Sequence, residues 1–146
     1  MAFRFTLDAV LRFRESVERS EEAVLHRIVQ EIAEAELELL QVGGRQSLLR
    51  ERRERDLTGK LPAVYLLEIA EQESDLQKVA DVLRLRLQQL EAQRIKQLAV
   101  YQAAHQDREV LSELRKRQRQ AHQLNQKRQE QRTLDDLFLV RGKGRD

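Results

Sequence analysis

Leu57-Thr58-Gly59-Lys60-Leu61-Pro62 is the stretch that decides the fold, because it is the clearest boundary between two long helical patterns. Gly59 can adopt the positive φ that often ends a helix. Pro62, the only proline in the chain, suits the first turn of a new helix and disfavours helix just before it. We therefore expect a turn over residues 57–62 that reverses the chain.

The residues before this turn predict one helix over about 6–56. Thr6 is suited to the N-cap, where its hydroxyl accepts a first-turn amide hydrogen. Apolar residues recur at steps of three and four, which is the period of a helix with one apolar seam. Polar residues interrupt this seam at Arg14, Glu18, Glu21 and Gln46. The seam residues themselves are Leu7, Leu11, Leu25, Ile28, Ile32, Ala35, Leu39, Val42 and Leu49.

Two neighbouring glycines, Gly43 and Gly44, lie inside the first helical pattern. Each costs about 1 kcal/mol relative to alanine in a helix. One interpretation is a kink or hinge at this point, and the other is a tolerated weak spot in a continuous helix.

A second helical pattern runs over about 63–138 without glycine or proline. Gly142 and Gly144 then predict a flexible tail over 139–146. The apolar seam of this second helix fades beyond Leu114, and it consists of Leu76, Ala80, Leu83, Leu87, Leu90, Tyr101, Ala104 and Leu111.

The two helices predict an all-α fold, a long two-helix antiparallel coiled-coil hairpin that forms a single domain over 1–146. In such a pairing Leu7 faces the region of Ser112, so the second seam fades where the first helix ends. Residues from about 114 to 138 are left as a C-terminal helical overhang. A lone helix of this basic, glutamine-rich composition is marginal in water and gains stability from a partner.

The composition argues against an enzyme. Charged residues make up 36% of the chain, and Cys and Trp are absent. The spacing of the three histidines, His26, His105 and His122, does not match that of metal ligands. No glycine-rich phosphate loop occurs, and a rod of two helices lacks a pocket that excludes water. We expect no catalytic residue, no metal and no cofactor.

Neither a signal peptide nor an apolar run of about eighteen residues is present, so we expect a cytoplasmic protein without membrane insertion. Residues 112–132 hold seven basic and two acidic side chains. This stretch could bind nucleic-acid phosphates. However, no aromatic residue is available there to stack on bases, which favours a solvated helix awaiting a protein partner.

Two groups of apolar residues are not explained by the seam, since the first is too dense for one seam position per turn and the second lies where the first helix offers no facing surface. Unpartnered apolar groups of this size usually mark a protein interface, although local capping by the turn or by Phe3 and Phe5 is the alternative. One group follows the turn and the other lies on the overhang: Val64, Tyr65, Leu66, Leu67 and Ile69, and Leu134, Leu137, Phe138, Leu139 and Val140.

Both ends of the chain resemble the FliJ family of flagellar export proteins. The first stretch is Phe3-Arg4-Phe5-Thr6-Leu7-Asp8-Ala9-Val10-Leu11-Arg12-Phe13-Arg14-Glu15, in which a phenylalanine and leucine lead into a Val-Leu pair and an Arg-Glu. Towards the other end, residues 101–114 and Gln129-Glu130-Gln131-Arg132-Thr133-Leu134-Asp135-Asp136 are similar to the family's C-terminal signature. Arg132 and Asp136 are conservative departures from the common Lys and Glu.

The resemblance implies a non-enzymatic, stalk-like coiled coil of flagellar type III protein export. It implies binding to the FliI-type export ATPase ring, the cytoplasmic domain of the FlhA-type export gate and substrate chaperones, at the cytoplasmic face of the inner membrane. Ring-binding residues carried over are Phe5, Leu7, Leu11, Gln131, Leu134 and Asp135. From the hairpin geometry we expect Tyr65, Leu66 and Ile69 to meet the gate or chaperones.

Two alternatives remain open at this point. The first is the equivalent stalk of a virulence-type injectisome, which neighbouring genes would distinguish. The second is a structural or nucleic-acid-binding coiled coil. A stable parallel dimer would favour the structural role, and steeply salt-dependent binding to nucleic acid would favour the nucleic-acid-binding role.

Overall fold

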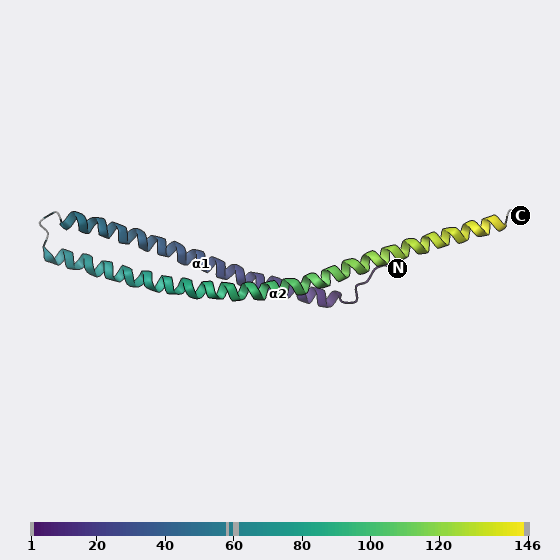
Figure 1. Cartoon of the computed structure of the whole chain (residues 1–146), viewed down its shortest axis with the longest axis horizontal. Helices are drawn as coiled ribbons and strands as arrows, with labels where there is room; N and C mark the ends of the chain where they lie inside the picture. Colours follow the sequence, from purple (N-terminus) through teal and green to yellow (C-terminus); the bar gives the residue numbers. More distant parts are fainter. Residues whose placement is uncertain (1, 58, 60–61, 145–146) are drawn as a thin grey trace. The chain divides into compact units, whose positions relative to one another are not determined.

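The computed structural model describes residues 2–57, 59 and 62–144 and contains two helices, α1 (Asp8–Leu57) and α2 (Ala63–Lys143) (Figure 1). No strand occurs among these described residues. Near the turn Arg53 bonds to Glu73, and further away Glu21 bonds to Gln97. The helices therefore pack antiparallel, and the predicted helical hairpin is confirmed.

Helix α1 begins two residues later than the sequence predicted, at Asp8. Thr6 and Leu7 form a turn, and the first helical hydrogen bond runs from the Leu11 N–H to the Leu7 carbonyl at 2.9 Å. Leu7 therefore occupies the cap position that was expected for Thr6. The Asp8 carboxylate lies in the first turn, where it stabilises the positive end of the helix dipole.

The connection between the helices uses Gly59 differently from the expectation. No described glycine has a positive φ, and the Gly59 N–H instead donates to the Asp56 carbonyl at 3.3 Å. Thr58, Lys60 and Leu61 of the expected turn lie outside the described residues. Helix α2 starts at Ala63, directly after Pro62, as the sequence indicated.

Helix α2 runs to Lys143, so the expected flexible tail from residue 139 is helical in its first five residues. Arg141 and Lys143 lie in the last turn, where positive charge stabilises the negative end of the helix dipole. The cost of about 1 kcal/mol for Gly142 is too small to stop the helix by itself. The Gly144 N–H donates to the Val140 carbonyl at 3.2 Å and closes this end.

Helix α1 passes through Gly43 and Gly44 without a break. A Cβ atom added at either glycine would meet no atom within 4 Å. The backbone at these positions is helical, and no neighbouring group demands the absence of a side chain. The continuous helix with a weak spot is therefore the interpretation that the structure supports.

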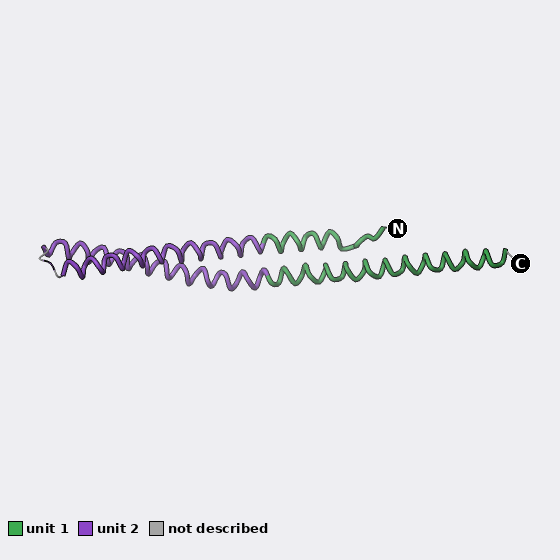
Figure 2. Tube along the Cα trace, turned by 90° about the horizontal axis from the view of Figure 1, so that it is seen from above, with its two compact units in different colours: residues 1–20, 102–146 green, residues 21–101 purple. Residues whose placement is uncertain are grey.

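The chain has two compact units, which Figure 2 shows in different colours. Unit 2, residues 21–101, pairs the larger part of α1 with the first half of α2. Its core cluster consists of the buried Val42, Ala80 and Leu83, against which Leu39 and Leu76 pack. Four further apolar residues are buried along the seam of this unit: Ile28, Ala35, Ile69 and Leu90.

Unit 1 combines residues 1–20 with residues 102–146. Its buried apolar residues are Phe5, Leu11 and Ala104. The Phe3 ring lies 5.6 Å from the His122 ring, centroid to centroid, so the segment before α1 also contacts α2. That the entire chain behaves as a single domain stays a prediction.

Candidate protein-binding surfaces

The final part of α2 is a helix without intramolecular cover. Every residue from Lys127 to Gly144 is exposed to solvent. Phe138 is 78% exposed, an unusual state for a phenylalanine in a folded protein. Its apolar neighbours are also 54% to 69% exposed, namely Leu134, Leu137, Leu139 and Val140.

The polar residues predicted for ring binding lie on this same exposed segment. The Gln131 Nε2 donates to the Asp135 Oδ1 at 3.5 Å, one helical turn away. Leu134 is adjacent to Asp135 in sequence and is 54% exposed. Gln131, Leu134 and Asp135 are thus accessible together, which a docking surface requires.

The three predicted residues near the N-terminus have a different environment. Phe5 and Leu11 are buried, with 8% and 2% exposure, and they form the interior of unit 1. Leu7 lies between these two and is 38% exposed. Leu7 can meet a partner directly, whereas Phe5 and Leu11 hold the N-terminal segment on α2.

The apolar cluster after the turn is divided between the seam and the surface. Ile69 is buried at 4% exposure and Leu66 is half-buried, so both belong to the helix pair. Tyr65 is 49% exposed, and its N–H donates to the Pro62 carbonyl at 3.1 Å. Of the three residues predicted for the gate or chaperones, Tyr65 offers the accessible side chain.

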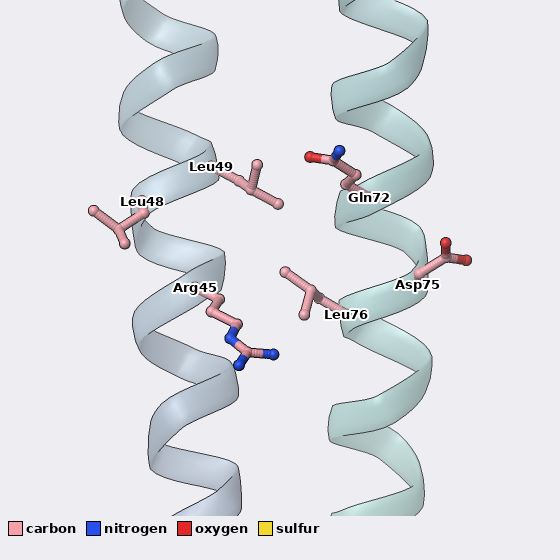
Figure 3. A pocket seen from close by; sticks show the side chains of 6 residues that line it. All are labelled: Arg45, Leu48, Leu49, Gln72, Asp75 and Leu76. Atoms are coloured by element: carbon pink, nitrogen blue, oxygen red, sulfur yellow. The ribbon is translucent and has the colours of Figure 1, made fainter.

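A shallow apolar groove of about 430 Å³ lies in unit 2, two turns beyond Tyr65 along α2. In Figure 3 Leu49 and Leu76 point toward one another between the helices, whereas Leu48 points away from α2. Arg45, Gln72 and Asp75 complete the lining. This groove was not predicted from the sequence. The available signal was Leu48, an apolar residue directly beside the seam residue Leu49.

The polar interruptions of the α1 seam are paired with α2. Glu18, whose side chain is 14% exposed, accepts from the Arg108 Nε at 2.5 Å and lies 3.0 Å from the His105 Nδ1. The hydrogen bond from Arg108, followed by that from His105, lowers the pKa of the Glu18 carboxyl below its ordinary value. The Glu18 carboxylate in turn raises the pKa of Arg108. The carboxylate is therefore stabilised in its charged form inside the helix pair.

The neighbouring interruptions follow the same rule. Arg14 Nη1 donates to Asp107 Oδ2 at 3.3 Å in unit 1. In unit 2 the Gln97 Nε2 donates to both the backbone carbonyl and the Oε2 of Glu21, at 3.1 and 2.5 Å. Charged and polar seam positions thus find partners on the opposite helix, where they take part in the pairing of the two helices.

The three histidines have structural surroundings as well. His26 lies 3.2 Å from the Gln30 Nε2, His105 belongs to the Glu18 network, and His122 contacts Phe3. Among the residues described, no three His, Cys, Asp or Glu side chains are grouped so that they could hold a metal ion. Over the same described ranges, neither helix is long and apolar enough to span a membrane.

Comparison with known protein families gives a match over nearly the whole chain. The family model described as "Flagellar FliJ protein" matches residues 3–145. Neither the curated proteins nor the solved structures include a significant match to the chain.

Proposed function

Since the chain belongs to the FliJ family, a coiled-coil group associated with flagellar protein export, we propose that it is the stalk that binds the export ATPase ring. The family assignment favours the flagellar system over the virulence-type injectisome. A family of non-enzymatic export components also agrees with a helix pair whose polar seam residues bond to one another.

The observation that supports ring binding is the exposed apolar end of the overhang. Leu134 and Phe138 lie one helical turn apart and are 54% and 78% exposed, without an intramolecular partner surface from α1. Large exposed apolar groups on one helix are typical of a helix that packs into a partner. We assign the direct contact to Leu7, Gln131, Leu134 and Asp135, with Phe5 and Leu11 positioning the N-terminal segment.

The proposed mechanism requires no chemistry from this chain. A stalk that binds the ring subunits unequally biases their conformations, and it thereby promotes ring assembly and ATP hydrolysis. Residues next to the turn, in unit 2, link the ring to the export gate and to substrate chaperones. There, the exposed Tyr65 and the groove lined by Leu48, Leu49 and Leu76 offer an apolar docking surface. We place the protein at the cytoplasmic face of the inner membrane, held there by these protein contacts.

The decisive experiment measures steady-state ATP hydrolysis by the export ATPase of the same organism. We expect the full chain to stimulate hydrolysis, and we expect a truncation that ends at Leu124 to lose the effect. Leu134→Asp should also lose most of it. Leu85→Asp is the matched control, because Leu85 is a similarly exposed leucine of α2, at 56%, in unit 2.

The outcomes separate the alternatives. Stimulation by the Leu85→Asp variant but not by the Leu134→Asp variant supports a ring contact on the overhang. Equal stimulation by both variants contradicts that assignment. If the full chain neither stimulates nor binds the ATPase, the stalk function itself is wrong.

A further inference from the structure

The segment formed by residues 2–20, called here the N-terminal arm, is held on α2 by few apolar contacts. Its buried apolar residues are Phe5 and Leu11, and the buried residue on the α2 side of unit 1 is Ala104. By contrast, unit 2 buries seven apolar residues: Ile28, Ala35, Val42, Ile69, Ala80, Leu83 and Leu90. Detachment of the arm therefore exposes less buried apolar surface than opening of unit 2 does, which makes it the less costly of the two openings.

Polar pairs replace apolar packing at the base of the arm. After Leu11, the next seam positions of α1 are Arg14, Glu18 and Glu21, and the following seam residue is Leu25. Arg14 bonds to Asp107, and Glu18 bonds to Arg108 and His105. Glu21, the first residue of unit 2, bonds to Gln97. The boundary between the two compact units in the sequence, at residues 20 and 21, falls inside this polar section.

The Glu18 network holds the arm in one alignment. Glu18 is 14% exposed and Arg108 is 26% exposed, so each charge has lost much of its water and depends on the other. A shift of the arm by one heptad would bring Glu18 beside Tyr101 or Arg115 instead and would leave Arg108 without this partner. Unpaired charges in a partly buried seam are strongly unfavourable. Such a pair specifies alignment more than it adds stability, because desolvation offsets most of the attraction.

We propose that the N-terminal arm is a strap that detaches from α2 as one unit while unit 2 stays paired, with the Glu18 network controlling its release. Detachment exposes the side of α2 that the arm covers over residues 102–122, including Ala104 and Leu111. The exposed surface of α2 then extends from the overhang toward the middle of the helix. A partner that binds this newly exposed surface competes with the arm. The inference concerns the chain alone and holds whether or not the ring is the partner.

The test uses the fact that the chain contains no cysteine. Ala104→Cys and Ala80→Cys each place one thiol at a buried alanine of α2, which is 7% exposed in unit 1 and 1% exposed in unit 2. The reaction of each thiol with a soluble disulfide reagent reports local opening under native conditions. Each rate is divided by the rate of the same variant unfolded in urea, which removes differences in intrinsic thiol reactivity.

We expect the thiol at position 104 to react at least about tenfold faster than the thiol at position 80. Adding Glu18→Ala should accelerate the reaction at position 104 by about tenfold again and leave position 80 unchanged, because Arg108, which is 26% exposed, then loses its carboxylate partner in the seam. The matched control is Glu31→Ala, which removes a carboxylate of α1 that pairs with Arg86 in unit 2. It should not accelerate the reaction at position 104.

Two results would overturn the proposal. Equal rates at positions 104 and 80 would mean that the hairpin opens only as a whole. A Glu18→Ala effect that is absent, or equal at both positions, would mean that the Glu18 network does not control the arm.

Discussion

Glu18 and Arg108 lie 90 positions apart in the sequence and are joined by a hydrogen bond of 2.5 Å between Oε2 and Nε. His105 approaches the other carboxylate oxygen at 3.0 Å. Both contacts are shorter than the 3.3 Å bond between Arg14 and Asp107 in the same unit, and the charge of the Glu18 carboxylate depends on pH.

The stability that Glu18 contributes should depend on pH. Glu18 has a lowered pKa in the folded protein because of Arg108 and His105. Its stabilising contribution is therefore complete above the ordinary pKa of 4.5 and is lost as the pH falls through the lower pKa of the folded state. We expect the difference in free energy of unfolding between wild type and Glu18→Gln to be about 1–2 kcal/mol at pH 7.

Urea denaturation at several pH values measures this difference. It should shrink as the pH falls from about 5 through the lowered pKa of Glu18. A difference that grows as the pH falls over this range would contradict the assigned direction of the pKa shift. The comparison with Glu18→Gln cancels the contributions of the other carboxylates.

The second prediction concerns the two glycines of α1. Gly43→Ala and Gly44→Ala should each raise stability by about 1 kcal/mol, because the helix is continuous and the added Cβ meets no atom within 4 Å. The double variant should melt about 4–8 °C higher in a thermal unfolding experiment followed by circular dichroism. Gly142→Ala, near the exposed end of α2, is the control and should change the melting temperature much less.

The third prediction compares two leucines of α2. Leu83 is 7% exposed in the core cluster with Val42 and Ala80, whereas Leu85 is 56% exposed. Leu83→Ala should lower the free energy of unfolding by about 2–4 kcal/mol, since it removes buried apolar surface and leaves a cavity. Leu85→Ala should change it by less than about 0.5 kcal/mol. Similar losses for both variants in urea denaturation would mean that the seam has a different register.

The fourth prediction separates folding from binding on the overhang. Leu134→Asp combined with Phe138→Asp should leave the melting temperature nearly unchanged, because both side chains are largely exposed. The same variant should weaken binding to the export ATPase at least about tenfold, if these residues fill apolar sites on the ring. Surface plasmon resonance with the immobilised ATPase measures this, and Leu85→Asp serves as the matched control. A large drop in melting temperature would instead indicate an intramolecular role.

The hairpin itself was predictable from the sequence. Pro62 marked the start of α2, and the heptad pattern identified the seam, with Leu11, Ile28 and Val42 buried as expected. Gly59 lacks the positive φ that was predicted for it. These features follow from local backbone chemistry and from a strong period, both of which the sequence carries directly.

The details that depend on register were harder to predict. The polar interruption at Glu18 was visible in the sequence. Its pairing with Arg108 depends on the register of the two helices, and the sequence does not fix the geometry of the turn that sets this register. For the same reason the cluster after the turn could not be divided into the seam residue Ile69 and the exposed Tyr65. The end of α2 was predicted too early, because Gly142 weakens the helix without stopping it.

Because α2 is continuous through unit 1, the direction of the Leu134 side chain about the helix axis is fixed relative to the part of α2 that the arm covers. Each residue of an α-helix advances the side-chain direction by about 100°. Inserting four alanines after Leu124 would move the Leu134 face forward by about 6 Å and turn it by about 40°, whereas inserting two would turn it by about 200° to the opposite side. A partner that binds both the arm and the overhang would therefore tolerate the insertion of four alanines far better than that of two, although two alanines add less length.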